Sequence, residues 1–451
     1  MTSDTALLKA LFNSFKPDMP LEPGDPRYVD CKSVRGDEDI ITELGGYITK
    51  DENNTYQLYS GHRGGGKSTE LLRLAKYLEE SEFLTVYFAA ATDDAGDLSF
   101  QDTQYQDILL SCTRQLLGKL KNRADTSPIE NWLRDRWEEL TDLALTEVKL
   151  EKLNLDVAVS QFAKITAAVR TEPNKRRQIR ELVEPNTESL VQALNQFIHN
   201  AKAKVMGGEN RLVVIADNLD RIVQNPKGDG NFTNLEDIFI NRSELMRSLD
   251  CHIIYTAPIS LLYSASSSEL QNIYGKIQIL PMVMVQSPEG EVLEEGMDKL
   301  RTAIARRVLA VCDRELVPQV FDSEETLRLL CFSCGGQLRD LMHMAREAVN
   351  QMERLPIAQK AVKRAIAKFR RGYMEALLEA EWPLLLQVRD TKRRINEDAY
   401  RDLLRKRCIL EYCFYNEDEE RIEWYDVHPL IWGAKLFKER WEAYRRASDE
   451  G

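Results

Sequence analysis

The stretch that decides the fold is GHRGGGKS, residues 61 to 68, with YQLYS (56–60) before it and TELLRLAKYL (69–78) after it. It fits the pattern GxxxxGK[ST], and the apolar positions that follow have the spacing of a helix. Glycines let successive backbone N–H groups converge on a phosphate, and the N-terminus of the helix adds partial positive charge. The stretch therefore predicts a strand, a phosphate-binding loop and a helix.

This loop predicts a site for ATP or ADP with Mg²⁺. Lys67 is expected to reach the β- and γ-phosphates, where it both binds and stabilises charge during catalysis, and Ser68 is expected to ligate the metal. The other loop residues expected to bind the nucleotide are Gly61, Gly64, Gly65, Gly66 and Thr69.

A second motif is the apolar run LVVIAD (212–217), which predicts a buried strand with an acid at its tip. Asp217 at this position can support Mg²⁺. Many ATPases of this kind have a glutamate directly after the acid, but here that residue is Asn218, a poor base. Asp220 is the nearest carboxylate, and it is either the base that orients the attacking water or the N-cap of a helix. Turnover is therefore expected to be slow.

The chain has 451 residues, 43% hydrophobic and 30% charged, which predicts a soluble globular protein of two or three domains. No run of about 18 apolar residues and no signal-peptide core occurs, so we expect a cytoplasmic protein that does not span a membrane. The net charge is −12, yet residues 354–446 hold 21 basic against 16 acidic residues, a net of +5. Two interpretations stay open, a surface that faces a polyanion and an ordinary solvated helix surface.

Alternating strands and helices predict an α/β fold with a parallel sheet covered on both faces. Residues 34–49 read as a helix, and a long excursion over 123–205 reads as a helix (129–143), an alternating strand or edge ribbon (153–159) and a helix from 175. From residue 295 the pattern is helical, with helices expected at 297–311, 324–334 and 337–352. The end reads as a helix (397–406), a strand (408–415), a turn, a strand (422–427) and a closing helix (429–446), which is the order of a winged-helix domain.

The sequence resembles the AAA+/STAND group of P-loop ATPases, including ATPase subunits of bacterial anti-phage systems. The resemblance rests on the phosphate loop, on DNLDR (217–221), on a strand that ends in YTAP (255–258), and on the helical and winged-helix patterns. It implies a P-loop sheet ordered 5-1-4-3-2 and a helical lid over the nucleotide. The implied divisions are 1–30 (N-terminal helix and base-packing segment), 31–290 (ATPase core with the insertion at 123–205), 291–390 (lid) and 391–451 (winged helix).

The resemblance also implies further site residues, each beside an ordinary structural alternative. Thr256 stands where sensor 1 belongs, or is a buried threonine. Arg339 in GGQLRD (335–340) stands where sensor 2 belongs, or pairs with Asp340 or Glu347. Tyr28 and Val29 resemble the segment that packs on the base.

His428 resembles the histidine that contacts the β-phosphate of ADP in STAND proteins. The alternative is a histidine that caps the closing helix or bonds to Asp426. The family's arginine finger is missing from residues 260–275, so a constitutive hexameric motor is not expected.

The preferred functional hypothesis is an ATP-binding switch with slow hydrolysis that controls an effector or sensor protein on a separate chain, with nucleotide-dependent oligomers and a role in bacterial defence. The alternative is a DNA-engaged AAA+ ATPase of the initiator or transposition-regulator kind. Basic runs at 392–394, 405–407 and 368–371 fit that alternative. A third possibility is a P-loop protein that holds nucleotide without turnover.

Overall fold

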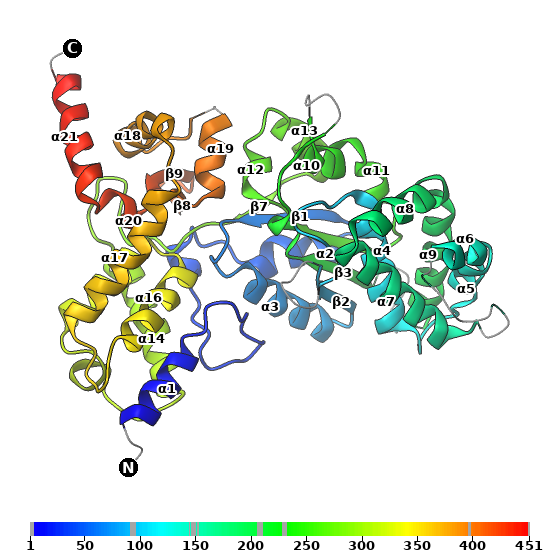
Figure 1. Ribbon diagram of the computed structural model, residues 1–451, viewed down its shortest axis with the longest axis horizontal. Coiled ribbons are helices and arrows are strands. Elements are labelled where there is room, and N and C mark those ends of the chain that lie inside the picture. The colour runs from blue at the N-terminus through cyan, green and yellow to red at the C-terminus, as the bar shows by residue number, and fades with distance from the viewer. Residues whose placement is uncertain are drawn as a thin grey trace. The chain divides into compact units, whose positions relative to one another are not determined.

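The computed structural model describes residues 4–90, 96–143, 145, 150, 153–204, 211–227, 232–395 and 398–449 (Figure 1). The chain forms two compact units. We call residues 40–60 and 71–278 the sheet unit, and residues 1–39, 61–70 and 279–451 the loop-and-lid unit. The division does not test the four predicted domains, whose bounds stay a prediction.

The five-stranded sheet has the order β2-β3-β6-β1-β7. Its strands are β1 (Tyr56–Gly61), β2 (Leu84–Ala89), β3 (Leu212–Asp217), β6 (His252–Thr256) and β7 (Gln278–Leu280). Neighbours β1 and β6, β6 and β3, and β3 and β2 run parallel. Numbered along the chain, the order is 5-1-4-3-2, which confirms the order expected from the sequence.

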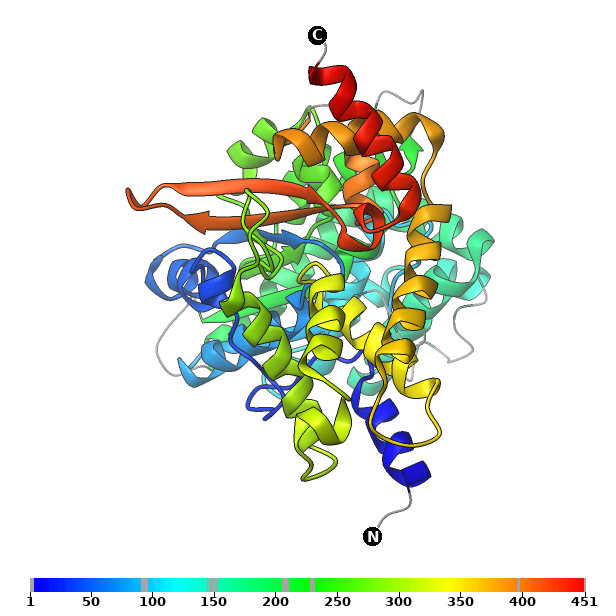
Figure 2. The same cartoon turned by 90° about the vertical axis from the view of Figure 1, so that its left-hand side faces the viewer.

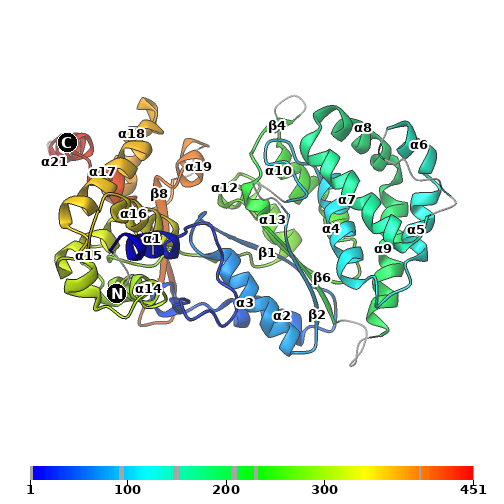
Figure 3. The same ribbon diagram turned by 60° about the horizontal axis from the view of Figure 1, so that its bottom comes forward.

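Helices cover both faces of this sheet, as a parallel sheet requires. Helices α2 (Gly46–Lys50) and α3 (Lys67–Glu80) lie on one face, and α4 (Tyr105–Leu120) lies on the other (Figure 3). The predicted helix over 34–49 is wrong in its first half, because the helical backbone begins at Ile41 as a wide turn that runs into α2. The remaining short elements of the sheet unit are β4 (Pro226–Lys227), β5 (Phe232–Thr233), α10 (Asn234–Glu236), α11 (Ser243–Met246), α12 (Ile259–Leu262) and α13 (Ser267–Tyr274).

The predicted insertion at 123–205 is helical wherever the structure describes it. Its helices are α5 (Ser127–Arg134), α6 (Trp137–Asp142), α7 (Leu155–Thr171), α8 (Pro173–Val183) and α9 (Thr187–Lys202). The predicted strand over 153–159 is wrong. The Asn154 side chain accepts a hydrogen bond from the Val157 N–H at 3.1 Å and so caps α7. The buried positions Ala158, Phe162, Ile165 and Val169 then follow the helical period rather than the period of two.

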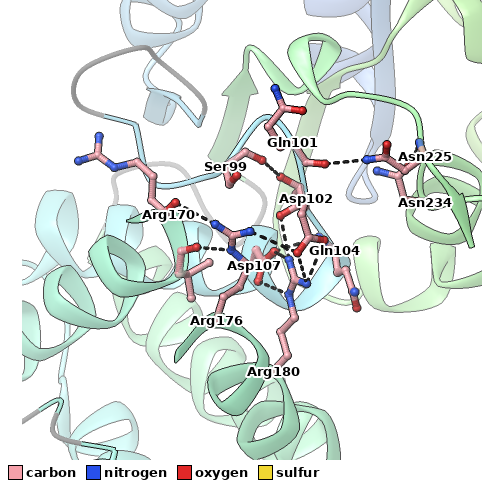
Figure 4. A network of polar contacts seen from close by, with 12 residues as sticks. Ser99, Gln101, Asp102, Gln104, Asp107, Arg170, Arg176, Arg180, Asn225 and Asn234 are labelled. Carbon is pink, nitrogen blue, oxygen red and sulfur yellow. Dashed lines mark hydrogen bonds and ion pairs between the residues drawn. The ribbon is translucent and has the colours of Figure 1, made fainter. Parts of the chain in front are cut away.

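Two buried arginines of α8 join the insertion to the start of α4 (Figure 4). Arg180 binds Asp107 at 2.5 Å and Asp102 at 3.0 Å, and Arg176 binds Asp102 at 3.2 Å. The segment before α4 also meets the segment after β3, where the Asn225 side chain donates to the Gln101 carbonyl at 2.6 Å. The insertion is therefore fixed to the start of α4 by ion pairs, of which the pair of Arg180 with Asp107 is buried.

The loop-and-lid unit is mostly helical. Helix α1 (Asp4–Ser14) packs on α14 (Glu294–Leu309) and α16 (Leu338–Asn350), and α17 (Gln359–Glu375) packs on α15 (Glu324–Ser333) and α16. These bounds confirm the predicted helices at 297–311, 324–334 and 337–352 to within a few residues. No helix in the described part of the chain is both long and apolar enough to cross a bilayer.

The end of the chain holds the predicted helix, hairpin and helix. After α18 (Trp382–Thr391) come α19 (Asp398–Arg405), the antiparallel pair β8 (Ile409–Tyr415) and β9 (Arg421–Val427), and then α20 (Pro429–Trp432) and α21 (Lys435–Asp449) (Figure 2). The rings of the paired residues Tyr412 and Trp424 stack at 4.5 Å and form a buried cluster with Met282, Met284 and Leu410. The predicted closing helix is interrupted at Gly433, so two helices replace the continuous one.

Arg180→Ala is expected to lower the free energy of unfolding of the sheet unit by about 3–5 kcal/mol, because it leaves the buried Asp107 carboxylate without its cation. The matched control is Arg177→Ala on the same helix, whose side chain is 75% exposed and should change stability by at most about 0.5 kcal/mol. Urea denaturation measures both. Equal midpoints for the two variants would contradict this account of the network.

Candidate functional site

The phosphate loop lies in the loop-and-lid unit, and the five carbonyl groups from residue 61 to residue 65 each accept a hydrogen bond. The donors are Lys67 Nζ to Gly61 (2.8 Å) and His62 (3.1 Å), Gln337 Nε2 to Arg63 (3.1 Å), the Arg339 N–H to Gly64 (3.1 Å) and Arg35 Nη2 to Gly65 (2.7 Å). A carbonyl aimed at an anion would repel it. With the carbonyls held by these donors, the first N–H groups of α3, which have no acceptor within the helix, are left for an anion.

Lys67 is buried, and its ammonium group donates to two loop carbonyls. These oxygens take the place that phosphate oxygens would take in a nucleotide complex. A nucleotide can therefore replace weak neutral acceptors by charged ones, which form the stronger hydrogen bonds.

Gly64 shows why the loop needs glycine at this position. Its φ of +87° lies in the left-handed region, and a Cβ on it would come within 2.6 Å of the Arg339 Cβ. The loop backbone and the start of α16 therefore approach each other too closely for a side chain at Gly64, which would separate them.

His62 ties the phosphate loop to the β8–β9 hairpin. Its ring is 1% exposed, and Nε2 accepts a hydrogen bond from the Glu411 N–H in β8 at 3.0 Å. Burial, with the nearby charge of Lys67, lowers the pKa of His62 to about 3, so the ring is neutral at pH 7 and Nε2 can act as an acceptor. His62 occupies a variable position of the motif, so no sequence signal marked it.

Three predicted nucleotide-binding residues lie along α3 and the N-terminal segment. The Thr69 hydroxyl accepts a hydrogen bond from the Leu21 N–H at 3.1 Å. The Tyr28 hydroxyl donates to Glu70 in the first turn of α3 at 3.2 Å, and Val29 is the next residue of that segment. The structure thus places Tyr28 beside the phosphate-loop helix, and the contact of Tyr28 and Val29 with a base stays a prediction.

In the sheet unit, Asp217 ends β3 and is 1% exposed. Its carboxylate accepts hydrogen bonds from the Tyr87 hydroxyl at 2.8 Å and from the Asn218 N–H at 2.6 Å. A carboxylate offers about four acceptor positions, and these two bonds fix its orientation at the tip of β3. Its oxygen chemistry at a strand tip fits Mg²⁺. Ser68 lies in the first turn of α3, and its role as a metal ligand stays a prediction.

The segment after Asp217 turns sharply. Asn218 has φ of +67° and is the N-cap of a short turn, Leu219–Arg221, that contains Asp220. Asp220 is therefore not the N-cap, and it is 5% exposed. The Thr256 hydroxyl, at the end of β6, accepts a hydrogen bond from the Leu219 N–H at 2.8 Å. Thr256 thus positions the turn that carries Asp220, and its role as sensor 1 stays a prediction.

The Arg339 side chain does not pair with Asp340 or Glu347, as one interpretation of the sequence had it. Its Nε atom lies 3.3 Å from a carboxylate oxygen of Asp18, and its backbone N–H holds the Gly64 carbonyl. The guanidinium is thus close to the loop and partly exposed, with a surface carboxylate as its partner. A role as sensor 2 stays a prediction that this position favours.

His428 caps a helix, as the structural alternative proposed. Its Nδ1 accepts from the Leu430 N–H at 3.1 Å, so the ring hydrogen is on Nε2, which lies 3.5 Å from Asp340 Oδ2. Asp340 is its acid partner, whereas Asp426, the other partner that the sequence offered, binds Lys392 and Arg389. Burial lowers the pKa of His428. Its contact with a nucleotide phosphate stays a prediction.

Asp340 joins the lid helices to the hairpin. It accepts from Tyr373 of α17 at 2.6 Å and binds Arg407, just before β8, at 3.2 Å. Burial by itself would raise the pKa of Asp340, but the hydrogen bond from His428 and the charge of Arg407 outweigh burial and hold it at about 2. Asp340 follows Arg339 directly, so one short segment contacts the phosphate loop and this buried cluster.

His62→Leu is expected to weaken ATP binding about five- to one-hundred-fold, because a buried N–H left without an acceptor costs about 1–3 kcal/mol and the loop loses its tether. His62→Gln is the matched control, since its amide oxygen can reach the place of Nε2 and should keep most of the affinity. Isothermal titration calorimetry measures both. Equal affinities of the two variants would show that the tether does not hold the loop.

Comparisons with known proteins give distant structural likeness alone. No protein-family model and no curated protein sequence matches the chain. Among solved structures, the chain is similar to the ORC2 protein of Aeropyrum pernix with ADPNP and ADP (11% identity, 97% of this chain and 98% of that chain, TM-score 0.41). It is also similar to Cdc6p of Pyrobaculum aerophilum (12% identity, 93% of this chain and 94% of that chain, TM-score 0.40). A third similar structure is Drosophila ORC bound to DNA (12% identity, 86% of this chain and 73% of that chain, TM-score 0.41).

Likeness at this level assigns neither a family nor an activity to the chain. The fold is instead defined by its own elements: the strand order 5-1-4-3-2, the phosphate loop between β1 and α3, and the helical C-terminal region. These are the elements of a P-loop fold of the AAA+ type.

Proposed function

We propose that this chain binds ATP with Mg²⁺, hydrolyses it slowly, and acts as a switch whose state is set by the bound nucleotide. The observation that supports this most is the phosphate loop, in which every carbonyl from residue 61 to residue 65 is held by a donor and the helix N-terminus is left for an anion. A loop whose carbonyl groups are held by donors and whose N–H groups lie at a helix N-terminus is suited to bind phosphate.

The roles of the residues follow from their chemistry. Lys67 exchanges its two carbonyl acceptors for phosphate oxygens and balances their charge. Ser68 and Asp217 supply the oxygen ligands for Mg²⁺, which when bound neutralises charge on the phosphates. Asp220 is the buried carboxylate assigned to orient the attacking water, because Asn218 cannot accept its proton.

The switch is a consequence of the contacts that surround the loop. When Lys67 leaves the carbonyls of Gly61 and His62, the backbone at His62 loses an internal bond, while the His62 ring stays bonded to β8. A change in the loop therefore reaches the hairpin directly. An effector or sensor protein on another chain, and nucleotide-dependent oligomers, are the proposed recipients of that change. The context of bacterial defence has no support beyond the sequence resemblance and stays a prediction.

The second candidate function is a DNA-engaged ATPase. Most cations of the basic runs predicted for this role have partners within the loop-and-lid unit. Lys392 binds Asp426 at 2.8 Å, and Lys406 binds Glu381 at 2.6 Å. Arg407 binds Asp340, so these runs are largely structural. The observation that favours this candidate is the basic surface on α17, which contains the run 368–371 and three further cations before it.

Lys67→Ala is expected to reduce ATP affinity at least about tenfold, because a charge-assisted contact is worth about 1.5–3 kcal/mol. Lys76→Ala is the matched control, since Lys76 lies on the exposed side of the same helix and pairs with Glu80. Calorimetry at fixed ionic strength gives both affinities. Parental affinity in Lys67→Ala would overturn the assignment of the loop.

Asp217→Ala is expected to lose Mg²⁺-dependent turnover, while Asp220→Asn keeps ATP binding and loses turnover, because the first removes a metal ligand and the second removes the base. Phosphate release and calorimetry together separate the two effects. If Asp220→Asn hydrolyses ATP at the parental rate, Asp220 is not the base. If the parent releases no phosphate at all, the chain holds nucleotide without turnover.

A further inference from the structure

Helix α17 presents a basic face to solvent. Its exposed residues recur at helical spacing: Lys360, Lys363, Arg364, Ala367, Lys368, Arg371, Gly372 and Glu375. The opposite face, with Val362, Ile366 and Tyr373, is buried in the loop-and-lid unit. Six basic residues against one acidic residue give α17 a net charge of +5 in a chain whose net charge is −12. The position of these cations is therefore fixed by packing on the other side of the helix.

The cations along this face differ in their partners. Lys368 binds Glu347 at 2.9 Å, and Arg371 binds Glu375 at 2.7 Å. Lys360, Lys363 and Arg364 have no carboxylate within 4.0 Å among the described residues, and we call these three the α17 triad. With Gln359 and Ala367 the triad lines an open hollow of about 410 Å³. Unlike the basic runs near the hairpin, the triad is not used by the fold.

We propose that the α17 triad binds the phosphate backbone of a nucleic acid. The α-helical rise of about 1.5 Å per residue spreads the triad over about 6 Å, and the paired Lys368 and Arg371 extend the basic face to about 16 Å. A basic face of this length suits a polymer with a regularly repeated negative charge better than a single small anion. Arg364 can bind a phosphate through two N–H groups, and the lysines act as point charges. The small side chain of Ala367 lies beside the triad in the hollow, and the space around Gly372 near the end of the face is open, so a backbone can approach.

Two other partners fit the face less well. A protein interface needs apolar anchors at its centre, and none of the large apolar side chains exposed on the described part of the chain belongs to α17. A membrane-surface helix needs a free apolar face, and the apolar face of α17 is buried. The contacts proposed here are to phosphates, so they predict affinity with little dependence on base sequence.

The test uses the full chain and a fluorescent 30-base-pair DNA duplex, with anisotropy measured from 50 to 200 mM salt. The triple variant Lys360→Gln, Lys363→Gln, Arg364→Gln should bind at least about tenfold more weakly at 50 mM salt. The slope of log affinity against log salt should fall by about 0.9 for each lost phosphate contact, up to about 2.7. A single-stranded 30-mer identifies which form of nucleic acid is bound more tightly.

The matched control is Lys435→Gln, Lys438→Gln, Arg445→Gln, which removes the same charge from exposed positions of α21. The proposal would be overturned if both triple variants lost the same DNA affinity, or if the salt slope of the α17 variant equalled that of the parent. It would also be overturned if the parent bound no DNA at 50 mM salt. Equal binding of poly-glutamate would overturn it as well, because the face would then accept any polyanion. ATP affinity of the α17 variant should equal that of the parent, so this result is independent of the proposed nucleotide site.

Discussion

The constraint on which the rest of the site depends is electrostatic. A loop that binds phosphate through its N–H groups must keep its carbonyl oxygens away from the anion, and buried carbonyls need donors. Here the donors come from Lys67 inside the loop, from Arg35 in the N-terminal segment, and from Gln337 and Arg339 at the start of a lid helix. The shape of the loop therefore depends on contacts from the N-terminal segment and from the start of α16.

The same dependence connects the phosphate loop to other elements of the loop-and-lid unit. The His62 ring extends the same set of contacts to β8, and Asp340 extends it to α17 and to the segment before the hairpin. A change at the phosphates thus has short, direct routes to the helix that carries the α17 triad. Since coupling between two sites is reciprocal, a ligand at the α17 face would in turn change nucleotide affinity if this route is used.

The sequence predicted an element correctly where its residue pattern fits only one kind of secondary structure. The run 212–216 is apolar throughout and, ending in Asp217, predicts a buried strand, and GxxxxGKS between a strand and a helix fixes the phosphate loop. It failed where two periods overlap, as at residues 153–159, because alternating Leu and Val also fit a helix once Asn154 caps it. The strand order came from a family resemblance and not from spacing.

The partners of side chains could not be predicted, because they depend on contacts between distant parts of the chain. Arg35 and His62 contact the loop and β8 with no local signal that marks them. Basic runs looked like a surface for polyanions, yet Lys392 and Lys406 are used by buried carboxylates. Charge counted along the sequence does not separate a cation that stabilises the fold from one that is left for a ligand.

Hydrogen–deuterium exchange of the full chain, with and without Mg–ATP, tests most directly the claim that the phosphate loop and the hairpin respond together. We predict that nucleotide changes exchange both at the loop and α3 and in β8, at the amide of Glu411, which His62 holds. A change confined to the loop and α3, with β8 exchanging at the same rate in both states, would contradict the account.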